Sequence, residues 1–160
     1  MVEQQNLQVV QSAFERLGAQ DAEGFMALLS DDVEWATPGP PDVLPFAGTH
    51  RGPRAVAAWF TQLNELEDVQ RFQPTDFLAQ GDKVVVLGES RVRVRATDRV
   101  IDDHWFHVYT VHEGKITRFR EAYDTAAEVA AHQQAQYGTA GAGPSSGSPA
   151  AARPMPPRTS

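Results

Sequence analysis

The hydrophobic positions at the start of the chain recur at the spacing of a helix. Leu7, Val10, Phe14 and Leu17 lie three or four residues apart, which predicts an amphipathic helix over residues 3–18. Polar residues occupy most of the intervening positions. We therefore expect this helix to bury one apolar stripe against the rest of a folded domain.

Two further helices and one strand follow in the first half of the chain. Asp21 can cap a short helix that carries Phe25, Met26, Leu28 and Leu29. The segment "DDVEWATPGPPDVLPFAGTH" predicts a strand from Val33 to Ala36 and then a loop with four prolines; loops of this length inside domains are often functional or lid-like. Pro53 begins a helix whose apolar stripe comprises Val56, Trp59, Phe60, Leu63 and Leu66.

After residue 69 the hydrophobic period changes from that of a helix to that of a strand. Short connections with turn-forming residues separate the apolar runs, which predicts a sequential antiparallel meander. A final helix is expected from Thr125, because Thr125 and Glu128 have the spacing of a capping box. The strands are expected at about residues 70–79, 83–95, 99–112 and 115–124.

This order of elements predicts an α+β domain. Three N-terminal helices packed on a strongly curved, mostly antiparallel sheet make a cone-shaped α+β barrel with an open end. The domain is expected to span residues 1–137. Residues 138–160 contain five prolines and four glycines, a composition that cannot bury enough apolar surface to offset its ordering entropy. We expect them to form a disordered tail.

Charge and composition exclude several classes of function. All 21 acidic residues but only 12 of the 14 basic ones lie in residues 1–137, which gives that region a charge of −9 and argues against a nucleic-acid partner. No apolar run is long enough to span a membrane, and the N-terminus does not resemble a secretory signal. The chain has no cysteine, which excludes disulfides and thiolate metal sites and fits a cytoplasmic protein.

Large residues occupy both faces of the late strands. Phe106 and Val108 have one parity, and Trp105, Tyr109 and Val111 have the other. One of these faces should cover the helices, so the other face needs a second cover. We expect that cover to be another copy of the chain, which predicts a homodimer formed through the sheet face.

Two segments resemble a known superfamily. The run "NLQVVQSAFERLGAQDAEGFMALLSDDVEW" is similar to the helical opening of nuclear-transport-factor-2-like proteins, and "HVYTVHEGKITRFREAYDTAA" resembles the closing hairpin of their SnoaL-like branch. The resemblance covers about residues 4–132 and implies the conical fold. Relatives include small polyketide cyclases, ketosteroid isomerases, limonene epoxide hydrolases and scytalone dehydratases, so the fold alone does not specify an activity.

This chain lacks the catalytic residues that two of these activities require. The resemblance aligns Ala13 with the catalytic tyrosine of ketosteroid isomerases and Thr37 with their catalytic carboxylate, which argues against that isomerisation. Epoxide hydrolases of this fold use an Asp–Arg–Asp arrangement, but Asp98 and Arg99 fall in a predicted turn. Asp102 and Asp103 remain as candidates for such chemistry, without a complete triad.

The polyketide-cyclase branch is the closer match. Its members place a histidine and an acidic residue on the last two strands, facing into the cone, and His107 and Glu121 occupy these places. The acid in the cyclases is an aspartate, so Glu121 is a departure by one methylene. The resemblance implies His107 and Glu121 as catalytic residues. The pocket walls are then expected to include Phe14, Trp35, Phe60, Trp105, Tyr109, Tyr123 and Asp124.

The turn between the last two strands decides whether His107 and Glu121 share a face. If "HEG" is a three-residue loop, Val111 closes against Lys115, and both side chains point to the same side. If "EG" is a two-residue turn, His112 closes against Lys115 and Glu121 points away. The residues permit both registers, and the family resemblance favours the first.

The sequence thus predicts a cofactor-independent protein that binds a hydrophobic small molecule. A carboxyl group and an imidazole in an apolar pocket can move protons for cyclisation or isomerisation of a carbonyl compound. No metal cluster, phosphate-binding loop or serine nucleophile motif is recognised, so neither a metal nor a cofactor is expected. The alternatives are a non-catalytic ligand-binding or dimerisation module of the same fold, and hydratase or epoxide-hydrolase chemistry.

Overall fold

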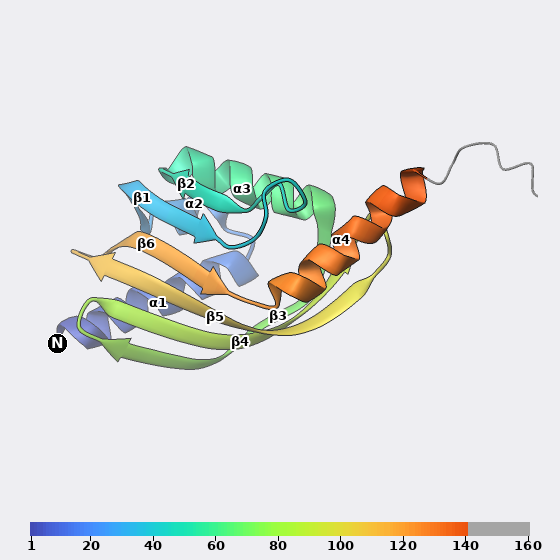
Figure 1. The fold of residues 1–160 in the computed structure, drawn as a ribbon. Coiled ribbons are helices and arrows are strands. Elements are labelled where there is room, and N and C mark those ends of the chain that lie inside the picture. The colour runs from blue at the N-terminus through green and yellow to red at the C-terminus, as the bar shows by residue number, and fades with distance from the viewer. Residues whose placement is uncertain (141–160) are drawn as a thin grey trace, which may run out of the picture.

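The computed structural model describes residues 1–140 as one α+β domain (Figure 1). The predicted tail lies outside the described residues from 141 onward. The helices of the described part are α1 (Val2–Gly18), α2 (Ala22–Met26), α3 (Pro53–Leu66) and α4 (Thr125–Ala140). Its strands are β1 (Leu29–Thr37), β2 (Gly48–Arg51), β3 (Glu67–Gln80), β4 (Lys83–Val94), β5 (Val100–His112) and β6 (Lys115–Ala122). Within this range no helix is both long enough and apolar enough to cross a lipid bilayer.

The six strands form one mixed sheet in the order β2-β1-β6-β5-β4-β3. Strands β3 to β6 form the predicted antiparallel meander. Strand β1 lies parallel to β6 and antiparallel to β2; neither pairing was predicted. The two edge strands β2 and β3 do not pair with each other, so the sheet is open and the expected barrel does not close. The α+β class is confirmed, but β1 and β2 separate α3 from the first two helices.

Several predicted element boundaries were wrong. Strand β1 begins at Leu29, so the second helix is shorter and the first strand longer than expected. Helix α4 is capped by Asp124, whose Oδ1 accepts a hydrogen bond of 2.9 Å from the backbone N–H of Ala127. The predicted capping box of Thr125 and Glu128 is therefore wrong, because Glu128 is buried and bonds elsewhere.

The β5–β6 hairpin uses the turn that the resemblance disfavoured. His112 pairs with Lys115, and the two residues between them, Glu113 and Gly114, have φ angles of 48° and 75°. Positive φ at both central residues is the signature of a type I′ turn, whose twist matches that of the flanking strands. The three-residue loop that we favoured, with Val111 closing against Lys115, is wrong.

A β-bulge then reverses the consequence of that turn. Val111 pairs with Ile116 and Thr110 with Arg118, so Thr117 is an extra residue in β6. One extra residue moves every later side chain of the strand to the opposite face. As a result His107 pairs directly with Glu121, and the expected shared face is formed by a route that neither sequence alternative contained.

The helices pack against one face of the sheet. Helix α1 contacts β3, β4 and β5, helix α3 contacts β1, β2 and β3, and α4 contacts β5. Figure 1 shows α4 lying across the far ends of the long strands. The core between these layers is largely aromatic, and Trp35 stacks on Phe119 at a ring distance of 3.9 Å. The face of the sheet that is turned toward the helices is its inner face, and it carries the candidate site.

Gly88 makes room for one wall of that inner face. It pairs with Trp105 across β4 and β5, and a Cβ atom at this position would lie 2.1 Å from the Trp105 ring. Any side chain at residue 88 must therefore displace the indole. The glycine is required here for space rather than for its backbone freedom.

We expect Gly88→Ala to lower the free energy of unfolding by about 2 kcal/mol, because the added methyl overpacks the aromatic wall. Denaturant unfolding measures the change. Gly18→Ala is the matched control, since nothing lies within 4 Å of a Cβ built there, and it should shift stability by less than about 0.5 kcal/mol. Equal stability of the two variants would contradict this account of Gly88.

Candidate functional site

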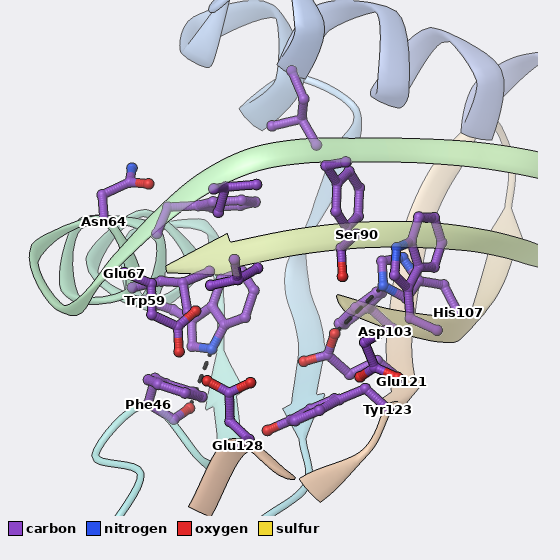
Figure 2. Close-up of a pocket in the computed structure, with 18 of the residues that line it drawn as sticks. Phe46, Trp59, Asn64, Glu67, Ser90, Asp103, His107, Glu121, Tyr123 and Glu128 are labelled. Carbon is purple, nitrogen blue, oxygen red and sulfur yellow. Dashed lines mark hydrogen bonds and ion pairs between the residues drawn. The ribbon is translucent and has the colours of Figure 1, made fainter. Parts of the chain in front are cut away.

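A cavity of about 460 Å³ lies between the sheet and the helices. This volume falls in the range of small-molecule sites. Most of its wall is apolar, and the aromatic members are Phe14, Trp35, Phe46, Trp59, Phe60, Phe72, Trp105, Tyr109, Phe119 and Tyr123. Its polar side chains include His107, Glu121, Asp103, Ser90, Glu67 and Glu128 (Figure 2).

His107 and Glu121 meet inside this cavity. The His107 Nε2 atom lies 3.4 Å from Glu121 Oε2, and the two side chains are 7% and 12% exposed. The imidazole ring lies 4.2 Å from the Trp105 ring and 4.8 Å from the Phe119 ring. An imidazole and a carboxyl group are therefore held together in aromatic surroundings that exclude most water.

Tyr109 determines the orientation of the His107 ring. The tyrosine oxygen lies 3.1 Å from His107 Nδ1. Burial, reinforced by the charge of Glu121, raises the pKa of Tyr109 well above its usual range, so the hydroxyl keeps its proton. A buried hydroxyl proton needs an acceptor, and His107 Nδ1 is the partner that the structure offers. This bond leaves the proton of a neutral imidazole on Nε2, the atom that faces Glu121.

Glu121 does not form the exposed ion pair that its neighbouring arginines suggest. Arg118 instead lies 3.6 Å from Glu34, and Arg120 is exposed on the other face of β6. In the cavity wall, which belongs entirely to the described residues, neither lysine nor arginine occurs. Among the described residues, the ion-pair contact of Glu121 is the one with His107.

Two hydrogen bonds anchor the proline-rich loop beside the cavity. Tyr123 donates a hydrogen bond of 2.9 Å to the Pro38 carbonyl, and Trp59 Nε1 donates one of 3.1 Å to the Phe46 carbonyl. Burial raises the pKa of Tyr123 far above its usual range, and nearby carboxylates add to this effect. These bonds hold the β1–β2 loop over the cavity, with Phe46 in its wall.

Most of the residues expected from the sequence come together here. The structure places His107, Glu121 and six of the seven expected wall residues around the one cavity, namely Phe14, Trp35, Phe60, Trp105, Tyr109 and Tyr123. Asp124 is the exception, because it is exposed at the start of α4 and caps that helix. Asp103, considered for epoxide-hydrolase chemistry, does line the cavity, whereas Asp98 pairs with Arg93 in an exposed turn.

A second polar cluster in the cavity wall was missed by the sequence analysis. His132 Nε2 lies 3.0 Å from Glu67 Oε1 and 3.2 Å from Glu128 Oε1, and all three side chains are less than 10% exposed. In Figure 2, Glu67 and Glu128 lie toward the opposite end of the cavity from His107. The four-residue spacing in "EVAAH" is a local signal for the pair from α4, but no local signal connects it to Glu67.

Burial sets the protonation of this cluster. It raises the pKa of Glu67 to about 8. It opposes the charged form of His132 too, but hydrogen bonds to Glu128 and Glu67 outweigh this and raise the pKa of His132 to about 9. Burial also disfavours the charge on Glu128, yet hydrogen bonds to His132 and Glu67 hold its pKa below the usual range. At neutral pH the cluster of two acids and one imidazole therefore has no net charge.

Residues 10–119 match the SnoaL-like domain family, which covers more than half of the chain. The chain belongs to this family. The fold and the pocket placement of the closing hairpin agree with that membership. No curated protein sequence matches this SnoaL-like protein significantly.

Solved structures of NTF2-like proteins share this fold. One from Burkholderia xenovorans LB400 is 38% identical over 81% of this chain and 97% of its own, with a TM-score of 0.74. One of unknown function from Burkholderia pseudomallei K96243 is 27% identical over 80% and 97%, with a TM-score of 0.71. A protein from Mesorhizobium loti described as a SnoaL-like polyketide cyclase is 22% identical over 72% and 97%, with a TM-score of 0.60; at that identity it supports the fold alone.

We expect Tyr109→Phe to destabilise the protein by about 1 kcal/mol, because it leaves a buried imidazole nitrogen without its partner. It should also shift the His107 proton from Nε2 toward Nδ1, which long-range ¹H–¹⁵N NMR of the histidine ring detects. Tyr123→Phe is the control, since it removes a buried hydroxyl that bonds to Pro38 instead. A His107 tautomer unchanged by Tyr109→Phe would refute the assigned orientation.

Proposed function

We propose that this SnoaL-like protein binds an apolar carbonyl compound and catalyses its cyclisation or isomerisation by general acid–base chemistry. The observation that carries the proposal is the direct pairing of His107 with Glu121 inside an aromatic cavity. Family membership is consistent with such an activity but does not specify it.

The roles of the two residues follow from their close approach in the cavity. Glu121 would remove a proton from the carbon next to a substrate carbonyl, giving an enolate. In cyclisation the enolate carbon attacks a second carbonyl carbon of the same molecule, and the new alkoxide takes the proton back from Glu121. In isomerisation the proton returns to a different carbon. His107 would donate from Nε2 to the carboxylate and hold it in place, because Tyr109 occupies Nδ1.

This chemistry is balanced without a redox partner or a nucleotide. The proton that leaves carbon returns to oxygen or carbon, and the aromatic wall keeps competing water away from the enolate. The apolar lining would select a hydrophobic ring system. The carboxylates in the wall, with no lysine or arginine beside them, would disfavour a substrate that is itself an anion.

The same wall argues against epoxide hydrolysis. That chemistry needs an arginine between two aspartates, but no arginine lines this cavity, which the described residues enclose. Asp102 pairs with Arg91 on the exposed face of the sheet. A ligand-binding module without catalysis is the remaining alternative, and substitution of the central pair separates it from an enzyme.

We expect Glu121→Gln to lower kcat at least about 100-fold, the usual contribution of a general acid or base, while ligand binding and the melting temperature change little. Aromatic diketones are the starting panel, with binding followed by the fluorescence of the cavity tryptophans and turnover by chromatography. His107→Asn should lower kcat in the same way. An unchanged kcat in both variants would exclude the proposed catalytic roles.

The control for this experiment is a second His–Glu pair, which lies across the neighbouring strands β4 and β5. His104 and Glu89 lie 3.9 Å apart, but their side chains are 80% and 40% exposed. His104→Asn and Glu89→Gln make the same chemical changes outside the cavity. They should leave kcat, affinity and stability within error of the unmodified protein.

We also propose that the chain forms a homodimer through the outer face of the sheet. This face carries the cross-strand pairs Leu87–Phe106 and Val85–Val108, and Phe106 is 51% exposed. Apolar cross-strand pairs of this kind on an open face favour burial against a second copy. The opposite face is occupied by the helices and the cavity.

Light scattering of the full chain should give twice the chain mass at micromolar concentration, and Phe106→Glu should shift it toward the mass of one chain. Thr61→Glu, at an exposed position of α3 on the opposite side of the sheet, is the control and should leave the dimer intact. A monomer in the unmodified protein would contradict this interface.

A further inference from the structure

We propose that Glu67, Glu128 and His132 form a binding site for one divalent transition-metal ion, with Zn²⁺ as the representative ion. This site goes beyond the proposed function and does not depend on it. It also replaces the expectation from the sequence that the protein carries no metal. The inference rests on the geometry of the three donor atoms, on their charge and burial, and on the cavity beside them.

The three donor atoms already have the spacing of metal ligands. One ligand atom from each residue lies within 4.8 Å of the others, and His132 Nε2 lies 3.0 and 3.2 Å from the two carboxylate oxygens. In a tetrahedral zinc site with bonds of about 2.0–2.1 Å, neighbouring ligand atoms are about 3.3 Å apart. Small side-chain movements would therefore suffice to admit an ion.

The backbone supplies these donors from two rigid elements. Glu128 and His132 are four residues apart on α4 and so project from one side of that helix. Glu67 is the first residue of β3 and reaches them from across the domain. The Phe46 ring contacts the imidazole edge to face at 6.0 Å and restricts its rotation. Donors held on a helix and a strand keep a metal site more exact than donors on loops.

A divalent ion would take the place of the protons that keep the cluster neutral. Once the Glu67 and His132 protons have left, two ionised carboxylates and a neutral imidazole carry a charge of −2, and within residues 1–140 neither glutamate forms an ion pair with a lysine or an arginine. A divalent ion between them would make the site neutral. Buried carboxylates of this kind are either paired, protonated or bound to a metal. The cluster is paired within itself, and the mutual spacing of its three donor atoms also suits the third of these states.

The open side of the cluster faces the cavity. Glu67 and Glu128 line the cavity wall, whereas His132 lies behind them. Three protein ligands with remaining positions toward a cavity is the arrangement of metal sites that accept water or a small ligand. One imidazole with two carboxylates suits zinc, manganese or ferrous iron, and it suits calcium or magnesium less well, because those ions take oxygen ligands alone.

The test uses the untagged full chain after treatment with a chelator. Zn²⁺ is added as its chloride in competition with a chelating dye, and we expect one ion per chain at saturation. His132→Gln and Glu128→Gln should each weaken binding at least ten-fold, because each removes one of three ligands. Circular dichroism and the melting temperature establish that each variant is folded before its affinity is measured.

The matched controls are His112→Gln and Glu113→Gln. These residues also place an imidazole beside a carboxylate, at 3.9 Å, but they are 73% and 86% exposed in the hairpin turn. They should leave the affinity for Zn²⁺ unchanged. If they weaken binding as much as the cluster variants do, the ion binds on the surface and the proposal is wrong.

A second measurement keeps the proposal testable if a cluster variant does not fold. In the unmodified protein, Zn²⁺ should displace the ¹⁵N resonance of His132 Nε2 and leave those of His104 and His112 in place. The melting temperature should rise with Zn²⁺ concentration as linkage requires. Saturation without a shift of His132, or no stoichiometric binding at all, would contradict the proposal. The cluster would then serve only to join α4 to β3 by hydrogen bonds.

Discussion

The candidate site depends on the register between β5 and β6. A two-residue turn at Glu113 and Gly114 fixes where the strands begin to pair, and the extra residue at Thr117 then changes which face each later side chain occupies. Without that bulge, Ile116 and Phe119 could not both be buried on the inner side. The core packing of these two residues therefore maintains the same register that brings Glu121 opposite His107. Packing and chemistry are constrained by one local irregularity, which is a common position for bulges beside functional sites.

The two buried histidines beside the cavity are tolerated because each one has partners, whereas the indole N–H groups of Trp35 and Trp105 have none among the described residues. His107 lies between Tyr109 and Glu121, and His132 lies between Glu67 and Glu128. A buried imidazole with a single carboxylate would leave one nitrogen unsatisfied, at a cost of about 1–3 kcal/mol. His107 meets its partners through both ring nitrogens, whereas His132 meets both glutamates through Nε2. The cavity wall between the two clusters is largely aromatic.

Much of the fold followed from sequence periodicity, but the long-range pairings did not. The apolar stripe of α1 and the alternation in β3 to β6 are local patterns, and they predicted those elements correctly. Strand β2 is only four residues long and mostly exposed, so it has no apolar alternation to detect. The parallel pairing of β1 with β6 joins residues more than eighty positions apart. The pocket aromatics could be named because large rings on the inner face of this fold often line the cavity, although the buried Phe25 does not. Glu67 could not be predicted as a site residue, because its partners on α4 lie more than sixty residues away in the sequence. Taken alone, each of the three residues looks like an ordinary polar residue in or beside a helix. The bulge at Thr117 has no sequence signature that separates it from a regular strand position.

The hydrogen bond from Tyr123 to the Pro38 carbonyl has a consequence for how a molecule could enter or leave the cavity. It joins the end of β6 to the loop that lies over the cavity, next to the walls that a bound molecule would touch. A molecule that passes between this loop and the strand has to break that bond first and lets it reform behind itself. The loop contains prolines that restrict how it can bend, and its Leu44 and Phe46 side chains are buried in the core. Entry by this route would then depend on this bond together with the bond from Trp59 to the Phe46 carbonyl.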